Sequence, residues 1–306
     1  MEKSTPAYAW RSTSERPATA DVRWSGAVGR GLLGRYARNR AATIGLVLVG
    51  VFALLVASAP AVAPVHYLQV GVGPLLEPPS LRYVMGTDDL GRNVFAGIVY
   101  GGRVSLAVGL AAAFFATIVG LALGLVAGYR GGMPDELIMR IGEFCQTLPR
   151  FMLALVLVAI LGPSVWNVVM VIAVLSWPLT ARLVRAEVLS LREREFVQAA
   201  RALAAPAHRL VFREIMPNAL APVVVNASLE VGRAILTEAS LSFLGLGDAN
   251  FPSWGYMLGY AQVLFRQAWW LSVFPGSAIL LVVLGFNLIG DGLNDVLNPR
   301  RDVALA

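Results

Sequence analysis

The 306-residue chain is 57% hydrophobic and only 14% charged, with a formal net charge of +6. Because ordinary soluble domains carry charge on about a quarter of their residues, this composition predicts a protein embedded in a lipid bilayer. The positive charge does not by itself indicate nucleic-acid binding, since the arginines flank apolar runs, where they set membrane topology. A single cysteine, Cys145, excludes an intrachain disulfide.

The residue types also argue against catalysis by this chain. Of the 25 basic residues, 24 are arginine, and Lys3 lies in a polar segment without the glycines of a Walker A loop. The two histidines, His66 and His208, fall in connections on opposite sides of the predicted membrane, so no nucleophile–base pair or zinc cluster is indicated. Asp88 and Asp89 offer too few oxygen ligands for calcium and suggest a loop-shaping turn. We expect no enzyme activity, no metal and no cofactor in this chain.

The N-terminal region precedes the apolar part of the chain. Residues 1–25 mix Ser, Thr, Pro, Glu and Arg without periodicity and predict a disordered cytoplasmic tail. In residues 26–40, Leu32, Leu33 and Tyr36 alternate with arginines, which predicts a short interfacial helix on the inner membrane surface.

The remainder, residues 41–301, predicts an all-α membrane domain with six transmembrane helices. Each span is judged against the roughly 20 apolar residues that cross a hydrocarbon core. Pro149 is expected to kink the third span. The predicted spans are 41–63, 104–128, 137–161, 165–184, 219–246 and 270–289.

The distribution of basic residues predicts the orientation. Residues 1–40 hold eight Lys or Arg and residues 182–218 hold seven, whereas 64–103 hold three and 247–269 hold one. Cytoplasmic connections carry the excess of Lys and Arg. Both termini and the 182–218 segment are therefore predicted to be cytoplasmic.

The fifth predicted span has one polar face. At 100° per residue its polar residues fall within an arc of roughly 80°, and Glu230 and Arg233 are spaced to form an i,i+3 ion pair. Ionisable groups at membrane depth face a bundle interior or a water-filled path. The face therefore predicts either a sealed ion pair between helices or the lining of a path or partner-subunit contact, and Glu238 lies off it without an evident partner. Its residues are Asn226, Glu230, Arg233, Thr237 and Ser240.

Small residues recur every four positions in the second predicted span. Gly120, Gly124 and Gly128 extend a face begun by Ala113 and Thr117. Such spacing lets helix backbones approach closely. We interpret it as packing within the bundle.

The segment 195–217 interrupts the apolar spans with two short predicted helices. Phe196, Ala199, Ala200 and Leu203 recur at helical spacing before Pro206, and the second helix is expected to end near Pro217. An interfacial linker on the lipid surface is one interpretation. A helix with a face of small residues is a poor membrane anchor, however, and favours insertion into a groove of another protein.

At QAARALAAPAHRLVFREIMPN (198–218) the sequence resembles the cytoplasmic EAA loop of permease subunits in bacterial ATP-binding-cassette importers. The family pattern is Glu-Ala-Ala, a Gly four residues on, and a Leu-Pro ending. Gln198 stands where the Glu is expected, Ala204 replaces the Gly, and Met216-Pro217 closes the loop. Further segments are similar to the dipeptide and oligopeptide branch: GTDDLGRNVFAGIVYGGRVSLAVGL (86–110), LGPSVWNVV (161–169), LSFLGLG (241–247), PSWGYML (252–258) and FNLIGDGLNDVLNPR (286–300).

The resemblance implies a type I importer permease with a coupling loop at 195–217, in the bacterial inner membrane. It implies as partners a second, homologous permease, two cytoplasmic ATPase subunits that hold ATP and Mg²⁺, and an extracytoplasmic substrate-binding protein, with lipid around the chain and no nucleic acid. Peptides are the implied cargo; nickel chelates or glutathione are alternatives within the class, and a secondary transporter or a channel is the alternative outside it. The residues implied to contact an ATPase are Glu195, Gln198, Ala199, Ala200, Leu203, Ala204, Arg209, Arg213 and Pro217.

Overall fold

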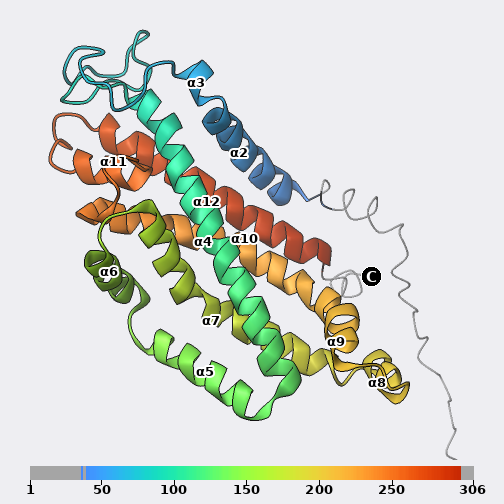
Figure 1. The fold of residues 1–306 in the computed structure, drawn as a ribbon. Helices are drawn as coiled ribbons and strands as arrows, with labels where there is room; N and C mark the ends of the chain where they lie inside the picture. The colour runs from blue at the N-terminus through green and yellow to red at the C-terminus, as the bar shows by residue number, and fades with distance from the viewer. Residues whose placement is uncertain (1–35, 37–38, 298–306) are drawn as a thin grey trace, which may run out of the picture.

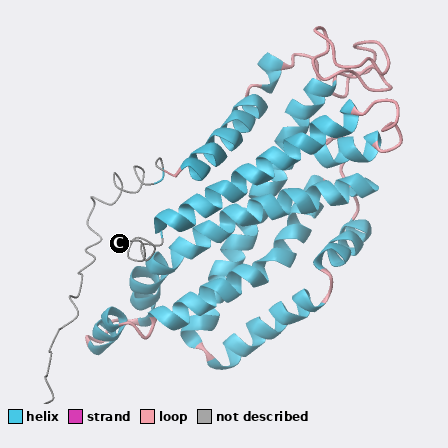
Figure 2. Ribbon diagram, turned by 180° about the vertical axis from the view of Figure 1, so that it is seen from behind, coloured by secondary structure: helices cyan, strands magenta, loops and turns pink. Residues whose placement is uncertain are grey.

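The computed structural model describes Tyr36 and residues 39–297. The predicted tail, nearly all of the predicted interfacial helix, and Arg300 and Arg301 lie outside the described residues. Within this part the chain is helical and forms an elongated bundle, with loops gathered mainly at one end (Figures 1 and 2). The only extended pairing among the described residues is an isolated bridge between Thr87 and Asn93.

The helices are joined mostly by short connections. Two π-helical turns, η1 and η2, are continuous with α10. The elements are α2 (Arg40–Ala57), α3 (Ala59–Val62), α4 (Val94–Arg130), α5 (Gly132–Thr147), α6 (Arg150–Leu161), α7 (Val165–Leu191), α8 (Glu195–Ala202), α9 (Ala207–Arg209), η1 (Leu210–Ile215), α10 (Met216–Leu241), η2 (Ser242–Leu246), α11 (Trp254–Ala261) and α12 (Trp270–Leu297).

Five helical segments of the described chain are long and apolar enough to cross a membrane. A sixth span results if α5 and α6, which meet at 88°, are taken together as one broken crossing. The break falls at Leu148-Pro149, and Pro149 caps α6. Proline removes a backbone donor and clashes with the preceding turn, so a bend is the expected result at this position.

The helices extend beyond the apolar runs. α4 has 37 residues and begins at Val94, ten residues before the predicted start at residue 104. Asn93 fixes this start, because its side-chain oxygen accepts hydrogen bonds from the backbone N–H groups of Phe95 and Ala96. α7 and α12 likewise continue to Leu191 and Leu297. Hydropathy detects the apolar part of a helix, whereas capping residues such as Asn93 determine where the helix begins or ends.

The prediction of a separate helix ending near Pro217 was wrong. α9, η1, α10 and η2 form one helical segment of 40 residues from Ala207 to Leu246, with a kink only near its end, at Gly245, whose φ is +86°. In η1 the N–H of Met216 donates to Val211 O, one residue further back than in an α-helix. This wider turn places Pro217 in the first turn of α10, where a missing N–H is tolerated.

The glycine face of α4 packs against α7, which confirms the packing interpretation. A Cβ atom added to Gly120 would lie 2.9 Å from Trp177 O, and one added to Gly124 would lie 2.6 Å from Ala181 O. The next glycine, Gly128, meets the Val188 side chain in the same way. These backbones are therefore closer than any side chain allows.

Three clusters of buried apolar side chains lie along the bundle. The first includes Trp254 and Ile235, and the second includes Ile172 and Leu241. The third joins α7, α8 and η1 through Val184, Val188, Val197, Leu210 and Ile215; we call it the α8-end cluster.

The contact between α4 and α7 predicts the effect of a single methyl group. Gly124→Ala should lower the stability of the detergent-purified protein by about 1–3 kcal/mol, because the methyl meets backbone that cannot move aside. Thermal unfolding measures this. Gly50→Ala in α2 is the matched control, since nothing lies within 4 Å of its added Cβ. Equal midpoints for the two variants would contradict the close packing.

Candidate functional site

A buried carboxylate lies at the centre of the polar face of α10. Glu230 is 1% exposed. Its Oε1 accepts a hydrogen bond of 2.8 Å from Arg150 Nη2, and its Oε2 lies 2.8 Å from Arg233 Nε. The contact with Arg233 is a close ionic contact without the alignment of a hydrogen bond. Two guanidinium groups thus share one carboxylate.

Hydrogen bonds extend this arrangement to a third helix. Arg150, the first residue of α6, also donates to the Ser176 hydroxyl of α7. Arg233 Nη2 donates to Asn226 Oδ1 at 3.0 Å, and Asn226 Nδ2 donates to Thr180 Oγ1 of α7 at 3.1 Å. The network, which we call the Glu230 cluster, therefore links α6, α7 and α10.

The residues of the predicted polar face form contacts within α10 and with α6 and α7. Glu230 and Arg233 form the i,i+3 pair expected from their spacing. Thr237 and Ser240 donate to carbonyl groups of their own helix, Arg233 O and Leu236 O, both at 2.8 Å. Arg150 was not predicted as a partner, because it lies 80 residues earlier in the chain. A charge within a predicted apolar span was the only signal for it.

Glu238, which had no evident partner in the sequence, is bound by hydroxyl groups. Its carboxyl group accepts from Ser105 Oγ of α4 at 3.3 Å and from Ser242 Oγ of η2 at 2.7 Å. Ser105 Oγ in turn accepts from the backbone N–H of Trp254 in α11 at 3.2 Å. This carboxyl group joins α4, α10 and α11.

The predicted loop-shaping turn is confirmed in the segment 64–93, which we call the cap. The Asp88 carboxylate is 1% exposed and accepts hydrogen bonds from the backbone N–H groups of Leu90 and Arg92. It also accepts from Arg92 Nε at 2.7 Å. The guanidinium of Arg92 lies 5.0 Å from the ring centroid of Tyr67 and 5.1 Å from that of Tyr260. The turn is therefore closed around a buried ion pair.

The cap is joined to α11 and α12. The Tyr260 hydroxyl donates to both oxygens of Asp89, at 2.7 and 2.9 Å, and Trp270 Nε1 donates to Thr87 O at 3.0 Å. Burial, together with the hydrogen bond to Asp89, raises the pKa of Tyr260 to about 12. The phenol stays a hydrogen-bond donor at physiological pH. In the part of the chain that the structure describes, no group of three or more potential metal ligands occurs.

The predicted coupling segment lies at the opposite end of the bundle from the cap (Figure 1). Val197 fixes α8 there, because it is fully buried in the α8-end cluster. Ala200 is half-buried against the same cluster. Ala199 is exposed, as are Gln198 and Ala204, and the Leu203 side chain is 84% exposed. Most of the predicted apolar face of α8 therefore points outward.

Ala204 ends α8 in an unusual conformation. Its φ is +56°, in the left-handed region that favours glycine. The N–H of Ala205 donates to Ala200 O at 3.1 Å, and the N–H of Ala204 donates to Arg201 O at 2.9 Å. This pair of hydrogen bonds is a Schellman motif, whose left-handed residue is usually glycine. The left-handed backbone explains why the EAA-loop pattern has Gly at the position of Ala204.

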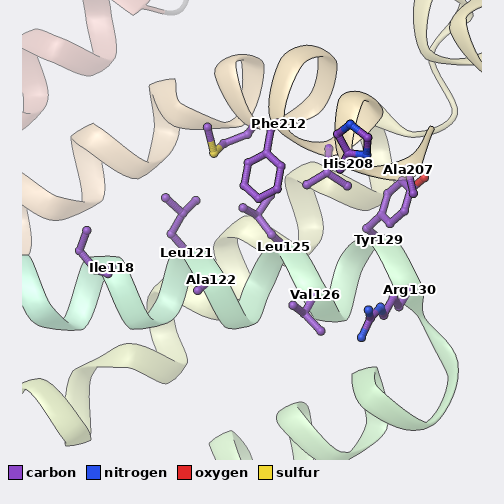
Figure 3. A pocket seen from close by; sticks show the side chains of 12 residues that line it. Ile118, Leu121, Ala122, Leu125, Val126, Tyr129, Arg130, Ala207, His208 and Phe212 are labelled. Atoms are coloured by element: carbon purple, nitrogen blue, oxygen red, sulfur yellow. The ribbon is translucent and has the colours of Figure 1, made fainter. Parts of the chain in front are cut away.

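An apolar groove of about 650 Å³ lies beside this end of the bundle, between α4 and the α9–η1 turn. Figure 3 shows Leu121, Leu125 and Phe212 along it, with Arg130 and His208 toward one end. The residues of the Glu230 cluster do not line it.

Residues 120–303 match the family of the binding-protein-dependent transport system inner membrane component. Residues 30–79 match the N-terminal transmembrane domain of oligopeptide transport permease C. The chain belongs to the binding-protein-dependent inner-membrane permease family.

Several relatives are similar over most of their length. The chain is 46% identical to the dipeptide transport system permease protein DppC of Alkalihalophilus pseudofirmus, covering 86% of this chain and 87% of the relative. It is 40% identical to the di/tripeptide transport system permease protein DppC of Pseudomonas aeruginosa, covering 87% and 90%. It is 35% identical to the oligopeptide transport system permease protein OppC of Bacillus subtilis, covering 87% and 88%.

The two buried carboxyl groups of α10 predict a contrast. Glu230→Gln should destabilise the protein by about 2 kcal/mol, because it leaves two guanidiniums without their carboxylate; their partial exposure reduces the full penalty for a broken buried pair. Glu238→Gln should cost less than about 1 kcal/mol, since the amide oxygen can still accept from one serine hydroxyl while the amide NH2 group donates to the oxygen of the other. Thermal unfolding of the two variants measures the difference. The reverse order would show that the Glu230 cluster does not hold the helices.

The left-handed backbone of Ala204 predicts that two substitutions at this position change stability in opposite directions. Ala204→Gly should stabilise the end of α8 by about 0.5–1 kcal/mol, as relief of strain exceeds the added chain entropy of glycine. Ala204→Val should destabilise it, because a branched side chain tolerates this conformation least. Hydrogen exchange of the amides of residues 199–205 reports both changes. Equal protection in the two variants would argue against a strained turn.

Proposed function

We propose that this chain is one permease of an ATP-driven importer and forms, with a second, similar permease, a path for peptides delivered by a substrate-binding protein. Membership of the family supports the permease role, and the names of the relatives support peptides as cargo. The observation that carries the proposal is α8: a short helix anchored by one buried residue, Val197, with an exposed apolar residue, Leu203, at its end.

In this proposal α8 inserts into a cleft of an ATPase subunit. Ala199 and Leu203 provide small and apolar contacts, and Gln198 stands where the family pattern has Glu. Gln198 Nε2 donates to Arg192 O at 3.1 Å, which ties the contact face to the end of α7. The remaining predicted contacts are Glu195, Ala200, Ala204, Arg209, Arg213 and Pro217.

The continuous helix gives this contact a mechanical consequence. The 26 residues of α10 span about 39 Å at 1.5 Å per residue, and this helix carries Glu230 and Arg233. Because Leu210 and Ile215 pack with Val197 in the α8-end cluster, displacement of α8 would be transmitted along α10 to the Glu230 cluster. ATPase dimerisation could then open and close the path.

The orientation follows from the arginine distribution, which puts the α8 end in the cytoplasm and the cap outside. A binding protein would then dock on the cap and on the α11 region, where the buried Asp88–Arg92 pair fixes the shape of the loop beneath its surface. ATP and Mg²⁺ would be held by separate ATPase subunits. Membrane lipid would cover the outward faces of the spans in the bacterial inner membrane.

Other cargoes fit the same architecture. Nickel chelates and glutathione are alternatives that a permease of this class could carry. A secondary transporter or a channel would work without an ATPase, and ATP dependence of uptake distinguishes them from an importer.

A substitution on the exposed face of α8 tests the coupling. Ala199→Arg should leave the protein folded and inserted, because the side chain is exposed, but should reduce ATP-dependent peptide uptake at least about tenfold by blocking a close helix contact. Ala200 is a poorer test site, since it is half-buried in the α8-end cluster. Uptake by proteoliposomes containing the complete transporter is the measurement.

Met133→Arg is the matched control. Met133 is 84% exposed and lies in the first turn of α5. This turn is at the same end of the bundle as α8 (Figure 1) but outside the proposed contact. The Met133→Arg variant should transport like the unsubstituted protein. Normal ATP-dependent uptake by Ala199→Arg would rule out α8 as the coupling helix.

A further inference from the structure

The Glu230 cluster carries an excess of positive charge. Arg150 and Arg233 contribute two guanidinium groups, and Glu230 contributes one carboxylate. Among the residues that the structure describes, no other carboxylate pairs with either arginine. At membrane depth an uncompensated charge faces water or an anion rather than hydrocarbon. The cluster is therefore electrostatically incomplete by one negative charge.

The exposed side of the cluster is the cationic side. The Glu230 side chain is 2% exposed, whereas those of Arg150 and Arg233 are 34% and 40% exposed. Arg150 uses Nη2 for both of its hydrogen bonds, and Arg233 uses Nη2 and Nε. The Nη1 group of each arginine has no protein partner within residues 39–297. Free donors of a planar guanidinium match the geometry of a carboxylate.

A hollow is lined by residues that follow Arg150 and Arg233 closely in the chain. It has a volume of about 460 Å³ and is lined by Phe151, Leu236, Ser240, Phe243 and Ile279 among others. Phe151 follows Arg150 directly, and Leu236 and Ser240 lie one and two helical turns beyond Arg233. The surroundings are apolar except for the Ser240 hydroxyl. Leu236 and Ser240 lie about 5 and 10 Å beyond Arg233 along the helix axis. A ligand that uses both the guanidiniums and the hollow would carry its carboxylate and its apolar side chain at about that separation.

We propose that Arg150 and Arg233 bind the terminal carboxylate of a peptide in the path, with the neighbouring side chain of the peptide in the hollow. This inference rests on the proposed function and specifies the substrate class of the same path: solutes with a free carboxylate. Glu230 holds the two guanidiniums in place from behind and makes no contact with the solute. A carboxylate of the second permease is the competing anion, and the experiment below separates the two.

The test compares one dipeptide with and without its carboxylate. Proteoliposomes containing the complete transporter take up radiolabelled Ala-Phe or Ala-Phe-amide, each with binding protein titrated to saturation. Every assay uses the same binding protein. The preference of that protein for one peptide over the other therefore cancels when a variant permease is compared with the unsubstituted chain. Arg233→Gln is expected to lower the ratio of Ala-Phe uptake to Ala-Phe-amide uptake about tenfold, the loss of one charge-assisted hydrogen bond, whatever the substitution does to the uptake of both peptides alike.

Two further variants control for charge and folding. Arg233→Lys keeps the positive charge but loses the planar guanidinium, and should retain only part of the discrimination. Arg140→Gln removes an equal charge from a side chain that is 72% exposed on α5, outside the cluster, and should not change the discrimination. Stimulation of ATPase activity by loaded binding protein reports whether each complex is assembled and coupled.

The outcomes are distinct. A collapse of discrimination in Arg233→Gln with intact ATPase stimulation supports the carboxylate site. An equal change for both peptides, or none, overturns it. Loss of the second permease on purification of Arg233→Gln also overturns it, because the anion then belongs to that subunit. If the unsubstituted complex takes up neither peptide in an ATP-dependent manner, the proposed function itself fails, and with it this inference.

Discussion

The arrangement of the spans depends on one buried carboxylate. Glu230 holds a guanidinium from α6 and one from its own helix, and hydrogen bonds continue from both to α7. A carboxylate inside a membrane bundle is destabilising unless it is paired, so the cluster constrains where α6 can lie. The 88° bend at Leu148-Pro149 places Arg150 at the first position of α6, within reach of Glu230. The bend at Leu148-Pro149 and the Glu230 cluster together fix the position of α6 against α10.

A second constraint runs along the chain. The helix from Ala207 to Leu246 joins the α8-end cluster to the Glu230 cluster without a break. Beyond them, Glu238 binds serine hydroxyls of α4 and η2, and the cap is held to α11 and α12 by Tyr260 and Trp270. The exposed α8 thus packs against the start of this helical segment, and the cap is linked to its other end through α11. In the proposed coupling, this continuity would carry a movement of α8 to the Glu230 cluster.

Sequence reasoning located features that depend on local pattern. Apolar runs placed the candidate spans, four-residue spacing identified the glycine face of α4, and helical periodicity identified the polar face of α10. It did not identify α11, which lies inside a predicted loop, because eight residues of helix between Gly- and Pro-rich flanks give a weak periodic signal. The Ala207–Leu246 continuity was missed because proline normally ends a helix, and the π turn before Pro217 leaves no mark in the sequence.

The partner of Glu230 shows that sequence reasoning does not reveal contacts between residues far apart in the chain. Arg150 was visible as a charge in an apolar span, but only the fold brings residues 80 positions apart together. The left-handed Ala204 is a converse case: the sequence marked it as a departure from a family pattern, and the structure supplies the physical reason for that pattern.

Labelling of one cysteine tests most directly whether the polar face of α10 lines an alternating path. In a Cys145→Ser chain, Thr237→Cys places a thiol on the half-buried part of this face. If the face lines the path, the rate of reaction with a membrane-impermeant maleimide in the assembled transporter should change between the nucleotide-free and ATP-bound states. Uniform protection in both states would contradict a path and indicate an ion cluster sealed inside the bundle.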